Sequence, residues 1–232
     1  MAKKKRYEYS TPSLSGVLNL GSEQAKSLVV RLPGRQTAPP FQGVSPALFA
    51  IDVVTRKMGK NNRGFDHKAV LAAVDSRLKT VEEEFGGEIE RLEIFIRNEN
   101  IKARASYNNP VEYSYEVTTP QIQRAADLIS NLDYLVQLVD TLWLTGRLSQ
   151  EEAESYKNGK TKTLTKAFRN LISTGFAARK KAFDQDSPEA VETQQDIIKA
   201  EAQAQAKAAE QEDDQDDASV AVEETKKNVA AA

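Results

Sequence analysis

The sequence contains no cysteine, one histidine and one tryptophan. Without cysteine, the chain can form neither a disulfide framework nor a thiolate metal site. The single histidine, His67, has no second histidine or cysteine to complete a set of metal ligands, so a capping or surface position is the better interpretation. We therefore expect no metal and no cofactor.

Long apolar runs are also missing. No segment approaches the run of about 18 apolar residues that a membrane helix requires, and the basic start at residues 1–6 is not followed by an apolar signal region. We expect a soluble, cytoplasmic protein that does not contact a membrane. Gly59-Lys60 lacks the upstream glycine of a phosphate-binding loop, and no nucleophile elbow is present. We therefore do not expect an enzyme.

Charge is distributed unevenly along the chain, although the net charge is only −2. Residues 182–232 hold 14 acidic residues against 4 lysines, whereas residues 1–181 hold 28 cations against 20 acids. A basic body with an acidic tail is frequent in proteins that meet nucleic acid, and a soluble domain with an arbitrary charge excess fits as well. We predict a basic arm at 1–13, one α+β domain at 14–183 and a disordered acidic tail at 184–232.

Residues 101–117 predict a β-hairpin. With Asn108-Asn109-Pro110 as a three-residue loop, strands 101–107 and 111–117 acquire one apolar face, because side chains alternate along a strand. The opposite face is polar and carries Lys102, Arg104 and Ser106 on the first strand. On the second strand, Glu116 lies opposite Lys102, and Glu112 lies opposite Ser106.

A long helix is predicted directly after the hairpin, at about 120–144. Thr118 or Thr119 can cap it, Pro120 suits its first turn and Gly146 its end. Apolar residues recur at helical spacing over an arc so broad that we expect the helix to be buried between other elements.

Other segments carry weaker signals. Helices are predicted at 46–58 and 68–85, and Gly86-Gly87 ends the second of them. Residues 88–98 fit a helix or a strand, and a strand there would make the sheet three-stranded. Residues 28–32 fit either a strand or the end of a helix that starts at Ser22. A capping box at Ser149 predicts a short helix that Asn158-Gly159 ends, followed by a basic helix at 162–183.

Three features favour binding to nucleic acid. Lys102, Arg104 and Ser106 alternate as a ribbon in a DNA major groove requires, although cross-strand ion pairs would explain them too. The basic helix suits contacts to the DNA backbone, since residues 160–183 contain no acidic residue. The turn at 56–63 adds further cations. A solvated face explains each of the last two equally well.

Several short segments resemble the AcaB-like family of transcriptional activators, encoded on conjugative plasmids and integrating conjugative elements. These segments are Asn109-Pro110-Val111-Glu112, Thr119-Pro120, Arg124-Ala125-Ala126-Asp127-Leu128, Asp133-Tyr134-Leu135-Val136, Thr141 and Gly146-Arg147-Leu148. The resemblance covers about residues 28–182. It implies an activator related to ribbon-helix-helix regulators, which act as dimers and place paired strands in the major groove. Strands 101–107, 111–117 and 28–32 are the candidates for that ribbon.

Our leading hypothesis is a homodimeric, sequence-specific activator of conjugative transfer genes, with a small antiparallel β-ribbon on a mostly helical body. Its partner is double-stranded promoter DNA. The acidic tail either contacts the transcription machinery or limits non-specific binding. The predicted DNA-binding residues in the ribbon are Lys102, Arg104 and Ser106. Those predicted to contact the DNA backbone are Lys162, Lys166, Arg169 and Arg179.

The alternative hypothesis is a protein-interaction subunit of conjugation or mobile-element machinery that does not bind DNA. The two differ in charge geometry. DNA binding as predicted requires Lys102 and Arg104 to share one continuous surface with the cations of residues 160–181.

Overall fold

The structure, a computed structural model, describes residues 12–31, 38–58, 67–183, 198 and 202. The predictions for residues 1–11, for the turn at 59–66 and for nearly all of the acidic tail lie outside these residues. The elements in chain order are β1 (Leu14–Leu20), α1 (Glu23–Val29), α2 (Pro40–Met58), α3 (His67–Asn98), β2 (Val111–Val117), α4 (Pro120–Leu144) and α5 (Gln150–Phe183).

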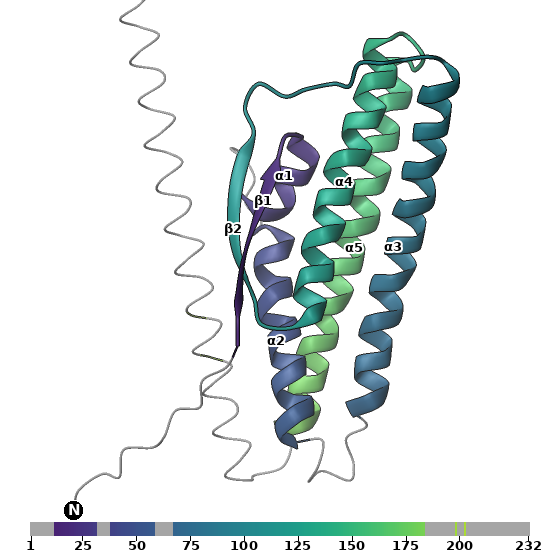
Figure 1. Ribbon diagram of the computed structural model, residues 1–232. Helices are drawn as coiled ribbons and strands as arrows, with labels where there is room; N and C mark the ends of the chain where they lie inside the picture. Colours follow the sequence, from purple (N-terminus) through teal and green to yellow (C-terminus); the bar gives the residue numbers. More distant parts are fainter. Residues whose placement is uncertain (1–11, 32–37, 59–66, 184–197, 199–201, 203–232) are drawn as a thin grey trace, which may run out of the picture.

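Three long helices, α3, α4 and α5, stand side by side, and α2 packs along the second half of α5 (Figure 1). The two strands and α1 lie on the side of the bundle away from α3. None of the helices in the described part of the chain is long and apolar enough to cross a membrane.

The predicted hairpin is wrong. Strand β2 pairs antiparallel with β1, in a register that places Leu14 opposite Val117 and Leu20 opposite Val111. Residues 101–110 have no regular secondary structure. The predicted apolar face of β2 is correct. That face can pair with the alternating apolar residues of β1 as well as with those of 101–107. Leu18 and Tyr113, which lie opposite each other, are both buried.

The predicted fold class is wrong as well. The described residues form five helices and one two-stranded sheet without a third strand, so the protein is mostly helical. The two strands come from distant parts of one chain, and the sheet covers the side of a helical bundle. A DNA-reading ribbon at 101–107 is therefore excluded, and residues 28–32 form no strand in the part described.

Helix α3 runs through Gly86-Gly87, where the sequence predicted a stop. Its buried residues Leu78, Val81, Phe85, Leu92 and Ile96 keep helical spacing on both sides of the glycines. Two glycines in a helix cost roughly 2 kcal/mol. Burial of several large apolar side chains outweighs that cost, at about 1.5–3 kcal/mol each. Of the two alternatives for 88–98, the helix is therefore correct and the strand is not.

Helix α5 continues through Asn158-Gly159, because side chains of α5 on both sides of this pair are hydrogen-bonded to α3 and α4. The Tyr156 hydroxyl donates to Glu88 at 2.6 Å. The Lys157 ammonium donates to Asp140 at 2.8 Å and the Lys160 ammonium to Glu84 at 2.8 Å. The capping box at its start is confirmed: the backbone N–H of Glu152 donates to Ser149 Oγ, and Glu152 accepts from the Ser149 N–H.

The predicted long helix is confirmed as α4, which begins at Pro120 and supplies twelve buried residues. Its N-cap is Thr119, although the buried Thr119 hydroxyl has no hydrogen-bond partner among the described residues. Of the alternatives for 22–32, the helix is correct, because Ser22 caps α1 by accepting the N–H of Ala25. Helix α2 begins at Pro40 rather than Pro46, since buried Phe41 and Val44 extend its apolar side.

Two glycines of α5 should respond oppositely to alanine. A Cβ at Gly175 would lie 2.9 Å from the Ala47 Cβ and 3.1 Å from the Ala47 carbonyl oxygen of α2. A Cβ at Gly159 would meet nothing within 4 Å. We expect Gly159→Ala to raise the free energy of unfolding by about 0.5–1 kcal/mol, and Gly175→Ala to lower it by about 1–3 kcal/mol through overpacking. Urea unfolding measures both, and equal gains in the two variants would contradict the close approach.

Candidate nucleic-acid interface

One face of α5 carries a row of exposed cations. Leu164, Phe168 and Leu171 are fully buried and define the face of α5 that packs on the core. The opposite face, at the 3–4-residue spacing of a helix, carries Lys162, Lys166, Arg169 and Lys180, all exposed. We call these four residues the outer stripe. From Lys162 to Lys180 the helix rises about 27 Å, which is the length of several phosphate spacings along DNA.

The charge of the outer stripe is not neutralised by the described residues. None of them forms an ion pair or side-chain hydrogen bond with Lys162, Lys166 or Arg169, and residues 160–183 contain no carboxylate. Two other cations of α5 differ: Lys157 pairs with Asp140 and Lys160 with Glu84 and Glu88. These two join α5 to α4 and α3, whereas the stripe cations have no such partner among the described residues and are available to an external anion.

A groove adjoins the stripe where α2 packs on α5. Its two halves have volumes of about 460 and 350 Å³ and share the lining residues Arg31, Ala38, Gly43 and Ile172. Arg169 lines one half and Arg179 the other. We call this the arginine groove. The described lining residues include no aspartate or glutamate.

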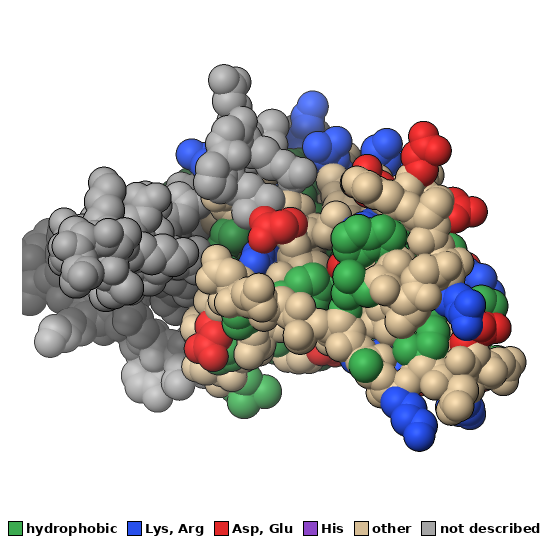
Figure 2. Space-filling model, turned by 90° about the horizontal axis from the view of Figure 1, so that it is seen from above, with side chains coloured by type: hydrophobic (Ala, Val, Ile, Leu, Met, Phe, Trp, Pro, Cys, Tyr) green, Lys and Arg blue, Asp and Glu red, His purple; other side chains and the backbone are tan. Residues whose placement is uncertain are grey.

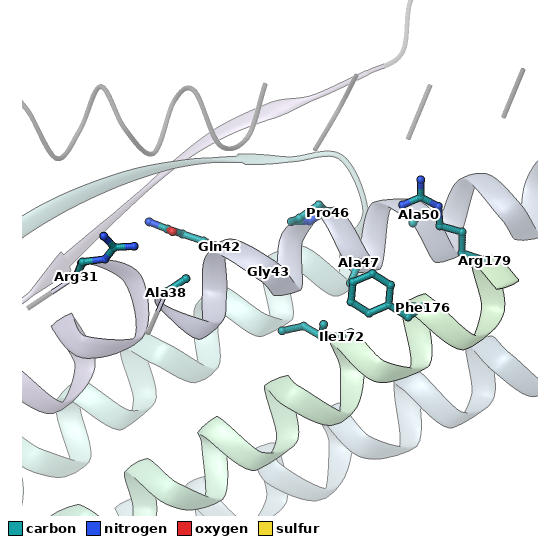
Figure 3. A pocket seen from close by; sticks show the side chains of 11 residues that line it. Arg31, Ala38, Gln42, Gly43, Pro46, Ala47, Ala50, Ile172, Phe176 and Arg179 are labelled. Atoms are coloured by element: carbon teal, nitrogen blue, oxygen red, sulfur yellow. The ribbon is translucent and has the colours of Figure 1, made fainter. Parts of the chain in front are cut away.

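Figure 3 shows how the arginine groove is arranged. Arg31, at the end of α1, lies at one end of the view and Arg179 at the other, with Ile172 and Phe176 of α5 between them. Phe176 is 63% exposed. The groove is therefore lined by apolar side chains and flanked by arginines, and it is suited to a ligand that combines apolar groups with negative charge.

The other predicted DNA-binding residues, Lys102, Arg104 and Ser106, are exposed on the irregular segment 101–107. Side chains of α4 hold this segment in place of a partner strand. The N–H of Ala105 donates to Thr141 Oγ1 at 2.9 Å, and its carbonyl accepts from the Gln137 amide at 2.7 Å. The backbone N–H and carbonyl of Ala105, which a sheet would otherwise pair, are thus satisfied by side chains of α4.

Arg104 is turned towards the seam between α3 and α4. Its guanidinium donates to the carbonyls of Ile101 and Ala103. The Tyr134 hydroxyl donates to Glu93, and that hydrogen bond, followed by burial, raises the pKa of Tyr134, while Arg104 acts in the opposite direction. Arg104 is thus held by local acceptors, unlike the outer stripe.

Tyr107 closes the segment against α4. Its hydroxyl donates to Asp140 at 2.8 Å, and Asp140 also accepts from Lys157 of α5. Burial, and then the hydrogen bond to Asp140, raise the pKa of the Tyr107 phenol, so it stays protonated. The segment is thus fixed to α4, whereas the outer stripe lies on the face of α5 opposite its buried residues.

The end of the bundle where α3 and α4 finish exposes apolar side chains. Phe95 is 42%, Trp143 41% and Leu144 65% exposed. Figure 2, which looks onto this end, shows apolar side chains gathered near the middle of the surface with charged ones around them. An apolar area with a charged rim is typical of a protein-binding surface.

Sequence reasoning grouped Lys162, Lys166, Arg169 and Arg179 correctly on one helix. It assigned Arg31 only to a candidate ribbon strand, and no local signal places residue 31 beside residues 169 and 179. Lys180 stood in the basic helix but was not selected. Its spacing of eleven residues from Arg169, three helical turns, would have found it.

No protein-family model matches the chain, and no curated protein matches its sequence. A solved structure does match: the crystal structure of selenomethionine-containing AcaB from uropathogenic E. coli. The TM-score is 0.69 and the sequence identity 28%, and the alignment covers 79% of this chain and 89% of AcaB. The chain therefore has an AcaB-like fold over most of its length.

Proposed function

We propose that the chain is a DNA-binding regulator of conjugative transfer genes on a mobile element, and that the outer stripe contacts the phosphate backbone. The observation that carries the proposal is a row of four exposed cations on α5 without a neutralising carboxylate among the described residues. The AcaB-like fold and the resemblance of its segments to the activator family give the regulatory context.

Contacts of this kind supply affinity and orientation, because each lysine or arginine that neutralises a phosphate releases a condensed counterion. They carry no base information, which must come from other side chains. Lys102, Arg104 and Ser106, which are exposed on the irregular segment 101–107, remain proposed contacts. Homodimer formation remains a prediction of the resemblance. A contact between the acidic tail and the transcription machinery remains a prediction from the sequence.

The stripe is tested by removing Lys162, Lys166 and Arg169 together as alanine variants in the full chain. We expect the slope of log affinity against log salt to fall by about 3, at roughly 0.9 per phosphate contact. Affinity for DNA at 0.15 M salt should fall about 100-fold by the same relation. Mobility-shift titrations at several salt concentrations measure both quantities, with promoter DNA of the host element and random DNA side by side.

The matched control removes three exposed cations of α3 that have no ion pair among the described residues, namely Lys68, Arg77 and Arg97. It changes the net charge equally but leaves the stripe intact, so the slope should stay near the wild-type value. Equal losses in the two triple variants would mean that only total charge matters, and the stripe would not be the interface. A further variant, Lys102→Ala with Arg104→Ala, tests whether segment 101–107 contributes to promoter preference.

The second candidate function is a protein-interaction subunit of conjugation machinery. One observation favours it: Phe95, Trp143 and Leu144 are exposed at one end of the bundle. If the wild-type chain shows no salt-dependent binding to either DNA, this candidate replaces the first.

A further inference from the structure

The arginine groove has two chemical parts. Arg31 and Arg169 are exposed, and the described residues offer neither of them a carboxylate. About one and two turns beyond Arg169 on α5, Ile172 and Phe176 form an apolar floor, and Phe176 is 63% exposed. An exposed aromatic side chain beside arginines is a typical anchoring point for a peptide. The ligand class that fits is an acidic segment followed by small apolar residues.

The chain contains such a segment. Residues 210–217 hold six carboxylates among eight residues, and Val220 and Val222 follow after Ala218 and Ser219. This is the densest run of acids in the tail. Carboxylates pair with arginine in a two-point geometry that lysine does not offer, which matches a groove flanked by arginines rather than lysines.

The segment can reach the groove. Helix α5 ends at Phe183, about one turn beyond Arg179, which lines the groove. The 26 residues between 183 and 210 can span at most about 90 Å, and Arg169 lies only about 15 Å from Arg179 along the helix. Being part of the same chain gives the segment an effective concentration on the order of millimolar, so weak pairing is sufficient.

We propose that residues 210–222 of this chain dock in the arginine groove, with the acidic run at Arg31 and Arg169 and the valines on the floor at Ile172 and Phe176. Arg169 belongs to the groove and to the outer stripe, so docking competes with a phosphate for the same guanidinium. This consequence rests on the proposed DNA-binding function, whereas docking itself does not.

Docking is measured in the full chain by spin-label distances. Because the chain has no cysteine, Gln42→Cys in the groove and Ser219→Cys in the tail give one specific label pair. Double electron–electron resonance should find a short-distance population. It should be lost when the six carboxylates of 210–217 become amides, and when Arg31→Gln and Arg169→Gln are combined. A label pair at Ser130 and Ser219, with Ser130 exposed on α4, should lack that population.

Arg77→Gln with Arg97→Gln is the control for charge loss, and the short population should persist in it. The same distances in the wild type and in the neutralised tail would overturn the proposal. So would a short population found only when singly labelled chains are mixed, because a second copy would then be the occupant.

A DNA arm separates this proposal from the function it builds on. Amide replacement of the six carboxylates should raise affinity for random DNA at least tenfold. If the short population is present but no DNA binds, docking stands and the proposed function fails. If affinity rises while the wild type shows no short population, the tail acts by general repulsion and docking fails.

Discussion

Replacing Asp133 by alanine should lower the free energy of unfolding by about 2–4 kcal/mol. The Asp133 carboxylate on α4 accepts three hydrogen bonds from the turn between β1 and α1: from the Gly21 N–H at 3.1 Å, the Ser22 N–H at 2.8 Å and the Ser22 hydroxyl at 2.6 Å. Ser22 is only 1% exposed, so its donors would lose their partner away from water. Hydrogen bonds to a charged group contribute about 1.5–3 kcal/mol, and orphaned donors add a desolvation cost.

Asp127→Ala is the control for the loss of a carboxylate on α4. Asp127 is exposed and accepts from Gln123, a contact within the helix, so its removal should change stability by less than about 0.5 kcal/mol. Chemical denaturation of both variants gives the comparison. If Asp133→Ala proves as mild as Asp127→Ala, the carboxylate does not hold the β1–α1 turn on α4.

Phe168→Ala should be more damaging, with a loss of about 3–5 kcal/mol and a melting temperature lower by roughly 6–20 °C. The Phe168 ring is fully buried, with its centroid 6.2 Å from that of Phe41 on α2. Phe41 in turn meets Tyr113 and Tyr115 of β2 edge-on, at 6.2 and 5.9 Å. The cavity would open where α2, α5 and the sheet meet, so all three should loosen together.

Phe176→Ala, two turns later on the same helix, removes an equally large ring that is 63% exposed. Thermal unfolding should shift by no more than about 3 °C in this variant. A similar loss at the two positions would mean that Phe176 is covered in solution, which is itself informative about the arginine groove.

Sequence reasoning succeeded where one element carried its own evidence. The apolar stripe of α4 extends over 25 residues, and Pro120 marks its first turn. The capping box at Ser149 is also a local feature. Sequence reasoning failed at Gly86-Gly87 and Gly159. There the helix-breaking tendency of glycine, about 1 kcal/mol per residue, is opposed by several kilocalories per mole of tertiary packing.

The hairpin error has a different physical cause. Strand β2 has one apolar face, and two segments of the chain present a matching alternation, 101–107 nearby and 14–20 far away. Loop closure favours the nearby partner, so the local pairing was the reasonable prediction. In the structure, Gln137 and Thr141 of α4 form hydrogen bonds with the backbone of Ala105, so segment 101–107 does not pair with β2. No pattern in the sequence indicates that two helical side chains take the place of a strand.

The candidate interface was predictable only in part. Spacing along one helix is visible in the sequence, so Lys162, Lys166 and Arg169 were grouped correctly. Arg31 and Arg169 line the same groove because of the way α1 and α2 pack against α5. The periodicity of the sequence does not predict that packing.

The pairing of Leu14 with Val117 affects the order in which the protein is completed during synthesis. Roughly 100 residues must leave the ribosome between the two strands, which takes about 5–20 s at ordinary elongation rates. Throughout that time β1 has an open hydrogen-bonding edge with Leu18 and Leu20 beside it, the kind of edge that other nascent chains can capture. Strand β1 is synthesised before α1 to α3, yet it can be paired only after they have been made.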